Sequence, residues 1–304
     1  MRQPLWLLPC LHAFTAPRAP RWARPTLRSA STTLGPGGRA GPSDAPPVYD
    51  DSGLLNSTLL AIFRDRVADE LGERERDDLT AWDGLIELVH RLNVKGPTPS
   101  ATREGARRIL NNCFPNLPSP TRGGQWRPLP EAFRELFVAQ KALRPFCAKL
   151  NAWVTMACSG WLMGRSTLED ADPADIAPGW GDGRAQVLKV ERCRFLEASG
   201  CASTCINMCK APTQTFFAED MAIPLHMEPD YDDFSCTFTF GKEAPPLELD
   251  AALAVPCFTQ CPTAGALRRQ CHYVPEPAVE RVAPALRLFA EAVENASRAE
   301  LAAG

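Results

Sequence analysis

The chain has 304 residues, of which 45% are hydrophobic, and this is enough for a sizeable core in one or two domains. Its formal net charge is −3, with 33 Lys and Arg residues against 36 Asp and Glu residues. We expect no nucleic-acid partner, because such partners are normally matched by a marked excess of basic residues.

The first 47 residues differ in composition from the rest of the chain. Six arginines stand against a single acidic residue, Asp44, in a segment rich in Pro, Ser, Thr and Ala. Such an Arg-rich, acid-poor segment is typical of an organelle transit peptide. The apolar run at residues 5–8 is too short for a secretory signal, because Pro4 and Pro9 enclose it. We expect residues 1–47 to be a transit peptide, the alternative being a plain disordered tail.

Residues 48–165 carry helical patterns. Apolar residues at helical spacing predict a first helix that begins near Ser52 or Asn56 and ends around Gly72. Thr80 predicts the start of a second helix, which Gly96 ends together with the following proline.

A third helix is expected from about Thr102 to Cys113. Its outer face is basic through Arg103, Arg107 and Arg108, and a run of charges like this one is typical of a solvated surface. A loop rich in Pro, Gly and Asn follows at residues 111–130. The next helix, at residues 131–144, is expected to break or kink at Pro145.

Beyond Pro145 an apolar stripe recurs at helical spacing. It consists of Phe146, Leu150, Trp153, Val154, Ala157 and Trp161. The segment is too short to span a membrane. We therefore expect either a core helix, which the pattern favours, or the wall of an apolar cavity.

The C-terminal half contains a polar linker at residues 166–184, a cysteine-rich region at 185–275 and a closing amphipathic helix at 276–304. Within the cysteine-rich region, alternation at residues 186–191 and again from Ser235 to Phe240 predicts two strands, and residues 195–217 read as one helix or two short ones. These elements predict an α+β fold, a mainly helical domain with a small antiparallel sheet in the cysteine-rich half.

The cysteines are unusually concentrated. Seven of the twelve lie between Cys193 and Cys261. Cys201, Cys205 and Cys209 are four residues apart, and four residues of an α-helix advance about 400°, so these thiols would share one helical face. Cys257 and Cys261 form a second pair that would close a site begun by this triplet.

Three interpretations of the cysteines compete. A disulfide framework requires an oxidising compartment. Structural zinc requires short Cys-x-x-Cys or Cys/His spacings, which this stretch lacks. Iron, as a mononuclear centre or an iron–sulfur cluster, tolerates longer spacings between thiolates. The spacing leaves open a metal site, reduced buried structural cysteines, and disulfides or redox-sensing thiols.

The cysteine-rich stretch also resembles a known family. The residues CRFLEASGCASTCINMCKAPTQTFF, then IPLHMEPDYDDFSCTFTFG and CFTQCPT, are similar to the C-terminal signature of the plastid β-carotene isomerase family of strigolactone biosynthesis, the dwarf-twenty-seven type. The likeness covers about residues 187–263. It implies a chloroplast enzyme that uses iron to interconvert all-trans and 9-cis β-carotene-like substrates.

The resemblance also suggests site residues. The cysteines at 201, 205, 209, 257 and 261 are the expected iron ligands, with no catalytic side chain assigned. Asn207, Lys210 and Gln214 would bind the cofactor by hydrogen bonds to metal-bound sulfur, the alternatives being helix capping and surface solvation. His226 is expected to be structural.

A C40 polyene is a rigid apolar rod, so the enzyme must offer it a long apolar groove or take it directly from a bilayer. Peripheral contact with plastid membranes is therefore a further expectation. Two other functions remain open. One is an iron–sulfur electron-transfer module, and the other is a carotenoid-binding factor without catalytic activity.

Overall fold

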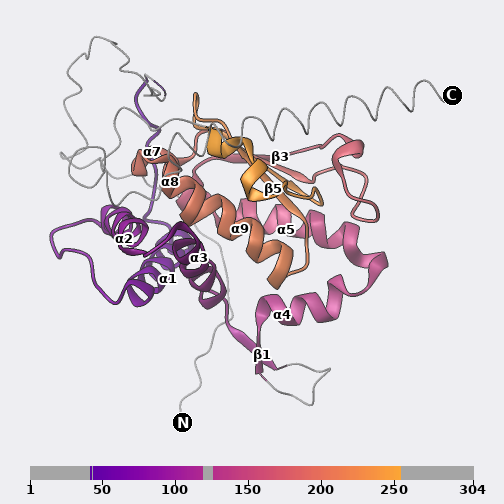
Figure 1. Ribbon diagram of the computed structural model, residues 1–304, viewed down its shortest axis with the longest axis horizontal. Helices are drawn as coiled ribbons and strands as arrows, with labels where there is room; N and C mark the ends of the chain where they lie inside the picture. Colours follow the sequence, from indigo (N-terminus) through magenta and orange to yellow (C-terminus); the bar gives the residue numbers. More distant parts are fainter. Residues whose placement is uncertain (1–41, 43, 119–125, 255–304) are drawn as a thin grey trace. The chain divides into compact units, whose positions relative to one another are not determined.

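The computed structural model describes residues 42, 44–118 and 126–254, which are drawn in colour in Figure 1. Most of the expected transit peptide, the closing helix, Cys257 and Cys261 lie outside the described residues. Within these ranges, helices precede a four-stranded antiparallel sheet in the C-terminal half, so the predicted α+β fold is confirmed. Among the described residues, no helix has both the length and the apolar character that a membrane span requires.

The first two helices begin and end close to their predicted limits. Helix α1 (Leu54–Leu71) ends at Gly72, which adopts φ 71°, a left-handed conformation that glycine tolerates without steric cost. Helix α2 (Ala81–Lys95) begins after Thr80, whose side-chain oxygen accepts a hydrogen bond from the N–H of Asp83 at 3.1 Å. Local capping chemistry therefore accounts for the end of α1 and the start of α2.

Helix α3 (Pro99–Asn112) begins three residues before its predicted start. Thr98 caps it by accepting a hydrogen bond from the N–H of Ala101, and Pro99 fits the first turn because no intrahelical N–H bond is needed there. Helix α3 contacts α1 on one side and the helical segment at residues 202–220 on another.

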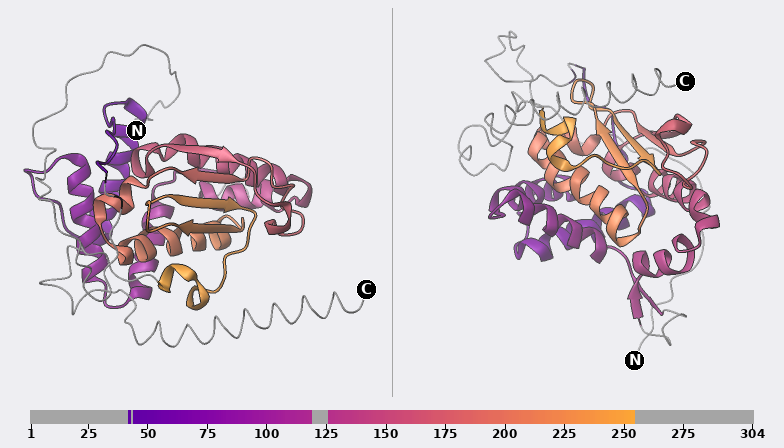
Figure 2. Two further views of the ribbon diagram at one scale, coloured as in Figure 1. Left: turned by 90° about the horizontal axis from the view of Figure 1, so that it is seen from above. Right: turned by 45° about the vertical axis from the view of Figure 1, so that its right-hand side comes forward.

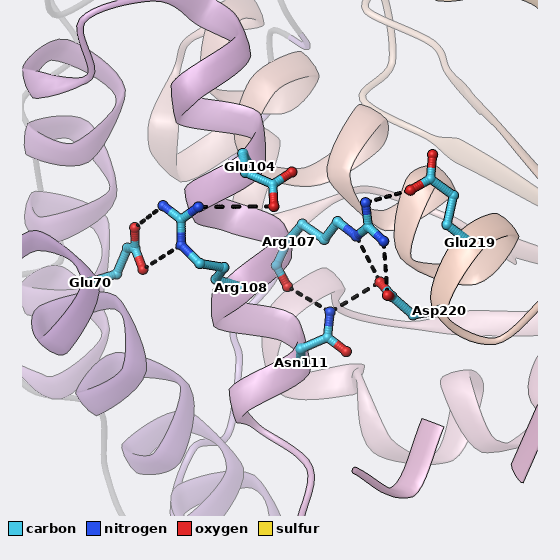
Figure 3. A network of polar contacts seen from close by, with 7 residues as sticks. All are labelled: Glu70, Glu104, Arg107, Arg108, Asn111, Glu219 and Asp220. Atoms are coloured by element: carbon cyan, nitrogen blue, oxygen red, sulfur yellow. Dashed lines mark hydrogen bonds and ion pairs between the residues drawn. The ribbon is translucent and has the colours of Figure 1, made fainter. Parts of the chain in front are cut away.

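The basic face of α3 is not simply solvated, which corrects the sequence interpretation (Figure 3). The Arg107 guanidinium binds both carboxylate oxygens of Asp220 at 2.7 and 2.8 Å and also reaches Glu219. Asn111 donates to the same Asp220 carboxylate at 3.0 Å. This pairing holds the pKa of the Asp220 carboxyl below its usual range despite partial burial. Residues 109 positions or more apart in sequence are thereby joined, and α3 is fixed against the segment that carries the cysteines.

A short hairpin and several helical turns follow α3. The two hairpin strands were not predicted. The helix expected at residues 131–144 ends earlier than predicted, at Val138, and Pro145 lies in the first turn of the next helix, α5. The elements are β1 (Asn116–Pro118), β2 (Trp126–Pro128), α4 (Leu129–Phe133), the π-helical η2 (Arg134–Val138), the 3₁₀ turn η3 (Lys141–Leu143), α5 (Arg144–Cys158) and α6 (Gly160–Met163).

The apolar stripe of α5 faces solvent, and the prediction of a core helix from it was wrong for this face. Phe146 and Trp153 are 55% and 54% exposed, whereas the buried face consists of Cys147, Ala148, Asn151 and Ala152. Small side chains let α5 approach strands β3, β4 and β6 closely. Of the two tryptophans of the stripe, only Trp161, in α6, is buried.

The sheet has the strand order β3-β4-β6-β5, and all neighbours are antiparallel. Strands β4 and β6 were predicted; β5 was not, and β3 lies in the expected linker at residues 166–184. Leu188 pairs with Phe238, which in turn pairs with Met227, and these three buried side chains lie on one face. The strands are β3 (Ser166–Glu169), β4 (Val187–Val190), β5 (Leu225–Pro229) and β6 (Cys236–Phe240).

Cys205 and Cys209 lie in a long helical segment, which Cys201 directly precedes. This segment runs alongside the sheet in Figure 2. Gly200 ends α7 (Arg194–Ser199) in a left-handed conformation with φ 55°. Residues 202–220 then continue without a break, and Pro212 lies inside this segment. The reason is that π-helical turns alternate with α-helical ones, so the wider backbone accommodates the missing N–H of the proline. The turns are α8 (Ala202–Thr204), η5 (Cys205–Lys210), α9 (Ala211–Thr215) and η6 (Phe216–Asp220).

Candidate thiol site

Four cysteine side chains line one small cavity, which we call the thiol pocket. Cys205 and Cys209 come from η5, Cys193 caps the start of α7, and Cys236 begins β6. The cavity measures about 10 Å³, at the lower limit of what one water molecule needs. Its other lining residues are Met163, Phe195, Leu196, Lys210, Met227, Pro229 and Phe238. The sulfurs therefore sit in a nearly dry, largely apolar environment.

Of the three predicted metal ligands that the structure describes, it brings two together in this pocket. Cys205 and Cys209 line the thiol pocket, whereas Cys201 is not among its lining residues. Cys201 is buried, but its backbone is extended (φ −142°, ψ 113°) because it caps α8 from outside the helix. It therefore does not continue the helical face that its spacing predicted. Cys257 and Cys261 lie outside the described residues.

Two cysteines that sequence reasoning did not select complete the pocket. Val190 pairs with Cys236 in the sheet, and the N–H of Cys193 donates to the carbonyl of Phe234 at 2.7 Å. These contacts place the end of β4 beside the start of β6, so both sulfurs arrive at the same end of the sheet. The sequence held a partial signal, because Cys236 alternates with Phe238 and Phe240 and so belongs to the buried face.

Burial controls the acidity of these thiols. Desolvation raises the pKa of Cys193 to about 11 and that of Cys205 to about 12, and it raises the pKa values of Cys209 and Cys236 well above their ordinary value. The neighbouring sulfurs raise the last three further, because a second negative charge would be close by. The Lys210 ammonium opposes the shift, and the Tyr231 hydroxyl donates a hydrogen bond to the Cys205 sulfur at 3.8 Å. Without a metal, the four groups are neutral thiols at physiological pH.

Lys210 extends into the protein beside the thiol pocket and is 1% exposed. Its Nζ lies 2.7 Å from Oδ2 of Asp250 and 3.1 Å from Oε1 of Gln214, and it also donates to the carbonyl of Met227. The amide oxygen of Gln214 accepts a second hydrogen bond, from the N–H of Met227 at 2.8 Å. The predicted pair Lys210 and Gln214 therefore lies together, where it joins the cysteine-bearing helix to β5.

Asn207, the third residue predicted to bind the cofactor, is not among the lining residues of the pocket. Its side-chain oxygen accepts a hydrogen bond from Arg103 at 3.0 Å, and its amide nitrogen donates to the Ser203 hydroxyl at 3.1 Å. That hydroxyl donates to the side-chain oxygen of Asn93. This buried polar chain connects η5 with α2 and α3, so the contacts of Asn207 are structural. His226 lies on β5, where burial lowers its pKa.

The residue types of the pocket favour a metal ion, whereas their arrangement does not. Thiolate sulfur suits soft and borderline metals, iron among them. Yet among the described residues, no group of three or more His, Cys, Asp or Glu side chains is placed to hold a metal ion. The four sulfurs as arranged here do not form a ligand set, and iron stays a prediction.

A larger cavity of about 380 Å³ lies between α3 and α9. It falls within the range of about 300–1,000 Å³ that is usual for small-molecule sites. Its lining includes Arg103, Glu104, Arg107 and Glu219. These charged side chains stand among uncharged ones such as Ala211, Pro212 and Leu247. Charged side chains do not suit a hydrocarbon, so the thiol pocket is the better candidate for polyene chemistry.

Comparisons with known proteins agree on one family. Residues 161–249 match the family model described as "Beta-carotene isomerase D27-like, C-terminal". The chain is 37% identical over 113 residues to "Beta-carotene isomerase D27, chloroplastic" of Arabidopsis thaliana, covering 37% of this chain and 40% of the relative. It is 30% identical over 182 residues to the protein of the same name from Medicago truncatula, covering 59% and 63%. No solved structure matches.

The chain thus spans less than two thirds of the length of either relative. Every residue that lines the thiol pocket nevertheless falls within the matched range. Residues 161–249 are thus similar to the β-carotene isomerase D27-like C-terminal domain, and both relatives support a likeness of the chain to the D27-type family.

Proposed function

We propose that the protein is a plastid carotenoid isomerase that interconverts the all-trans and 9-cis forms of a β-carotene-like substrate. Two relatives carry the name β-carotene isomerase, which supports a carotenoid substrate and an isomerase reaction. The observation that carries the proposal is the position of the thiol pocket, whose lining lies wholly inside the matched domain. A place in strigolactone biosynthesis follows from the same resemblance and is part of the proposal.

The chemistry of the substrate fits a dry, sulfur-lined site. A polyene double bond rotates slowly until its π-bond order falls, and a hydrocarbon offers no polar group for ordinary acid–base catalysis. Met163, Phe195 and Phe238 provide apolar contact beside the sulfurs and exclude water. Because the cavity is only about 10 Å³, these side chains must move before a polyene can reach the thiols.

Iron dependence is the second part of the proposal. It is supported by the soft donor chemistry of Cys205 and Cys209 and by the two further thiols beside them. Bound iron would supply a one-electron relay to the polyene. The sulfurs would have to move closer together to hold it, because as arranged they form no ligand set, and the apolar side chains around them would keep water away.

The equilibrium of the reaction provides the decisive test. Purified protein, incubated with all-trans or with 9-cis β-carotene in detergent micelles, should produce the same final isomer ratio from either starting isomer, as resolved by chromatography. The reason is that a catalyst changes only rates, and an isomerisation consumes no NAD(P)H. Cys158→Ser, a change at an exposed cysteine, should leave the rate unchanged.

Two results would contradict the isomerase proposal. Folded, iron-loaded protein that changes neither isomer would favour an electron-transfer module. Folded protein that retains carotenoid in a fixed isomer ratio, with no iron bound, would favour a binding factor.

Chloroplast localisation is proposed from the names of the relatives and from the Arg-rich, acid-poor residues 1–47. A fluorescent reporter fused behind residues 1–60 should accumulate in plastids, because the targeting information lies in that composition. Fluorescence microscopy of plant cells checks this. Accumulation in the secretory pathway would contradict both the localisation and the assumption of reduced thiols.

A further inference from the structure

Large exposed hydrophobic side chains are concentrated in one part of the described chain. Of the twelve such side chains among the described residues, nine lie between Phe114 and Val154. The remaining three are Val48, Leu54 and Leu55. Exposed apolar residues scattered singly are normal, whereas a concentration of them marks a contact surface.

The elements that carry these side chains contact one another in sequence. The hairpin β1–β2 contacts α4, α4 continues into η2, and η2 contacts both η3 and α5, which forms the arc from β1 to α5 in Figure 1. We call the exposed side chains of this arc the apolar surface, defined by Trp126, Leu136, Phe137, Phe146, Trp153 and Val154. Trp126 is 71% exposed.

Helix α5 shows that this exposure is built into the fold. Phe146 and Trp153 are seven residues apart, two turns of the helix, and so lie on the same side. The opposite side, which packs on the sheet, carries the small residues Cys147, Ala148 and Ala152. A helix of a soluble protein normally buries its large apolar residues. Here the large residues point outward, and an apolar partner is needed to remove them from water.

The charges around the apolar surface indicate the kind of partner. Between residues 126 and 158, the basic residues whose side chains the structure describes are Arg134, Lys141, Arg144 and Lys149, against the acidic Glu131 and Glu135, whereas the whole chain carries a net charge of −3. Lys141 is exposed, the Arg144 guanidinium lies over the Trp180 ring, and Lys149 pairs with Asp182 at 2.8 Å. Basic residues among Trp, Phe and Leu suit the headgroup region of an anionic bilayer. A symmetric contact with a second copy would place the same positive region against itself.

We propose that the apolar surface docks on an anionic lipid bilayer, from which the protein takes its carotenoid. The proposal deepens the proposed function, on which the identity of the substrate depends. Trp153 and Phe146 insert at the boundary between headgroups and acyl chains, while the basic residues contact lipid phosphates or sulfonates. The bilayer then supplies the hydrocarbon that water cannot dissolve.

Vesicle flotation of the full chain tests this proposal. The vesicles are phosphatidylcholine with or without phosphatidylglycerol, and the variant is Phe146→Ala together with Trp153→Ala. We expect binding to weaken by at least about tenfold, because two large aromatic side chains no longer enter the interface. The matched control is Leu54→Ala with Leu55→Ala, which removes exposed apolar side chains outside the surface and should leave binding unchanged. Every variant keeps the same Arg-rich N-terminal residues, so any binding by them is common to all.

A second measurement locates the contact without weakening the fold. Lipids with brominated acyl chains should quench Trp fluorescence in the wild type, and Trp153→Phe should remove part of that quenching while vesicle binding is retained. Equal flotation of the alanine variant and the wild type, or quenching unchanged by Trp153→Phe, would overturn the proposal. So would wild-type dimers that the alanine changes convert to monomers without loss of vesicle binding.

The carotenoid assay separates this proposal from the isomerase proposal. The alanine variant should isomerise carotenoid in detergent micelles at the wild-type rate but act at least about tenfold more slowly on carotenoid in vesicles. If no protein isomerises carotenoid in micelles while vesicle binding still depends on Phe146 and Trp153, the isomerase proposal fails and membrane docking stands.

Discussion

Replacing Lys210 with methionine should lower the free energy of unfolding by about 3–5 kcal/mol, the cost of leaving one partner of a buried ion pair without its counter-charge. The side chains of Lys210 and Asp250 are 1% and 4% exposed, and the atoms that pair are 2.7 Å apart. Without the ammonium group, the Asp250 carboxylate remains buried with no neutralising charge at that distance. The measurement is urea unfolding with linear extrapolation to water.

Two variants make the Lys210 prediction specific. Adding Asp250→Asn to Lys210→Met should restore most of the lost stability, because no unpaired charge then remains buried while the side-chain oxygen still accepts the hydrogen bond from the N–H of Ala252. Lys149→Met breaks an exposed pair with Asp182 and should cost less than about 1 kcal/mol. Lys210→Met protein as stable as the wild type would show that the pair does not carry this energy.

Cys205→Ser and Cys209→Ser should each lower bound iron and the isomerisation rate by at least about 10–100-fold. Loss of a residue that only hydrogen-bonds to a metal ligand already costs this much, and loss of the ligand itself should cost no less. The reason is that serine replaces a soft thiolate with a harder oxygen, and an incomplete soft site binds iron poorly. The measurement is iron per protein after anaerobic purification, together with the rate in micelles. Cys158→Ser, at an exposed position outside the pocket, should change neither quantity.

The same experiment distinguishes two sets of sulfur ligands. The helical spacing predicts that Cys201→Ser also lowers bound iron. The thiol pocket instead predicts this loss for Cys193→Ser and Cys236→Ser, whose sulfurs line the cavity with those of Cys205 and Cys209. If the Cys205 and Cys209 variants both bind as much iron as the wild type, neither of the two proposed sets of sulfur ligands holds the iron. Isomerisation by protein without iron would refute the electron relay. It would not contradict the proposal that the substrate binds at the thiol pocket.

The sequence by itself determined the features that depend on neighbouring residues. Thr80 and Gly72 set the limits of their helices, since capping hydrogen bonds and a left-handed glycine are local. The alternation of Cys236, Phe238 and Phe240 was enough to predict β6 and its buried face. The family resemblance likewise followed from the sequence, because it is a property of residue order.

Only the tertiary structure decided which sulfurs meet. Cys193 and Cys236 reach the pocket through the register of β4 with β6, and the hydrogen bonds that set this register join residues far apart in the chain. The counter-charge of Lys210 likewise lies forty positions further along, at Asp250, and no local pattern connects the two.

The sequence also did not predict which side of α5 packs against the sheet, for a different reason. Its apolar stripe identified a helix, but the stripe did not indicate which side meets the sheet, because the opposite side carries small residues that can also be buried. Close packing decided it: the strands accept the small side chains of Cys147, Ala148 and Ala152, and the large side chains of Phe146 and Trp153 are left on the outer surface.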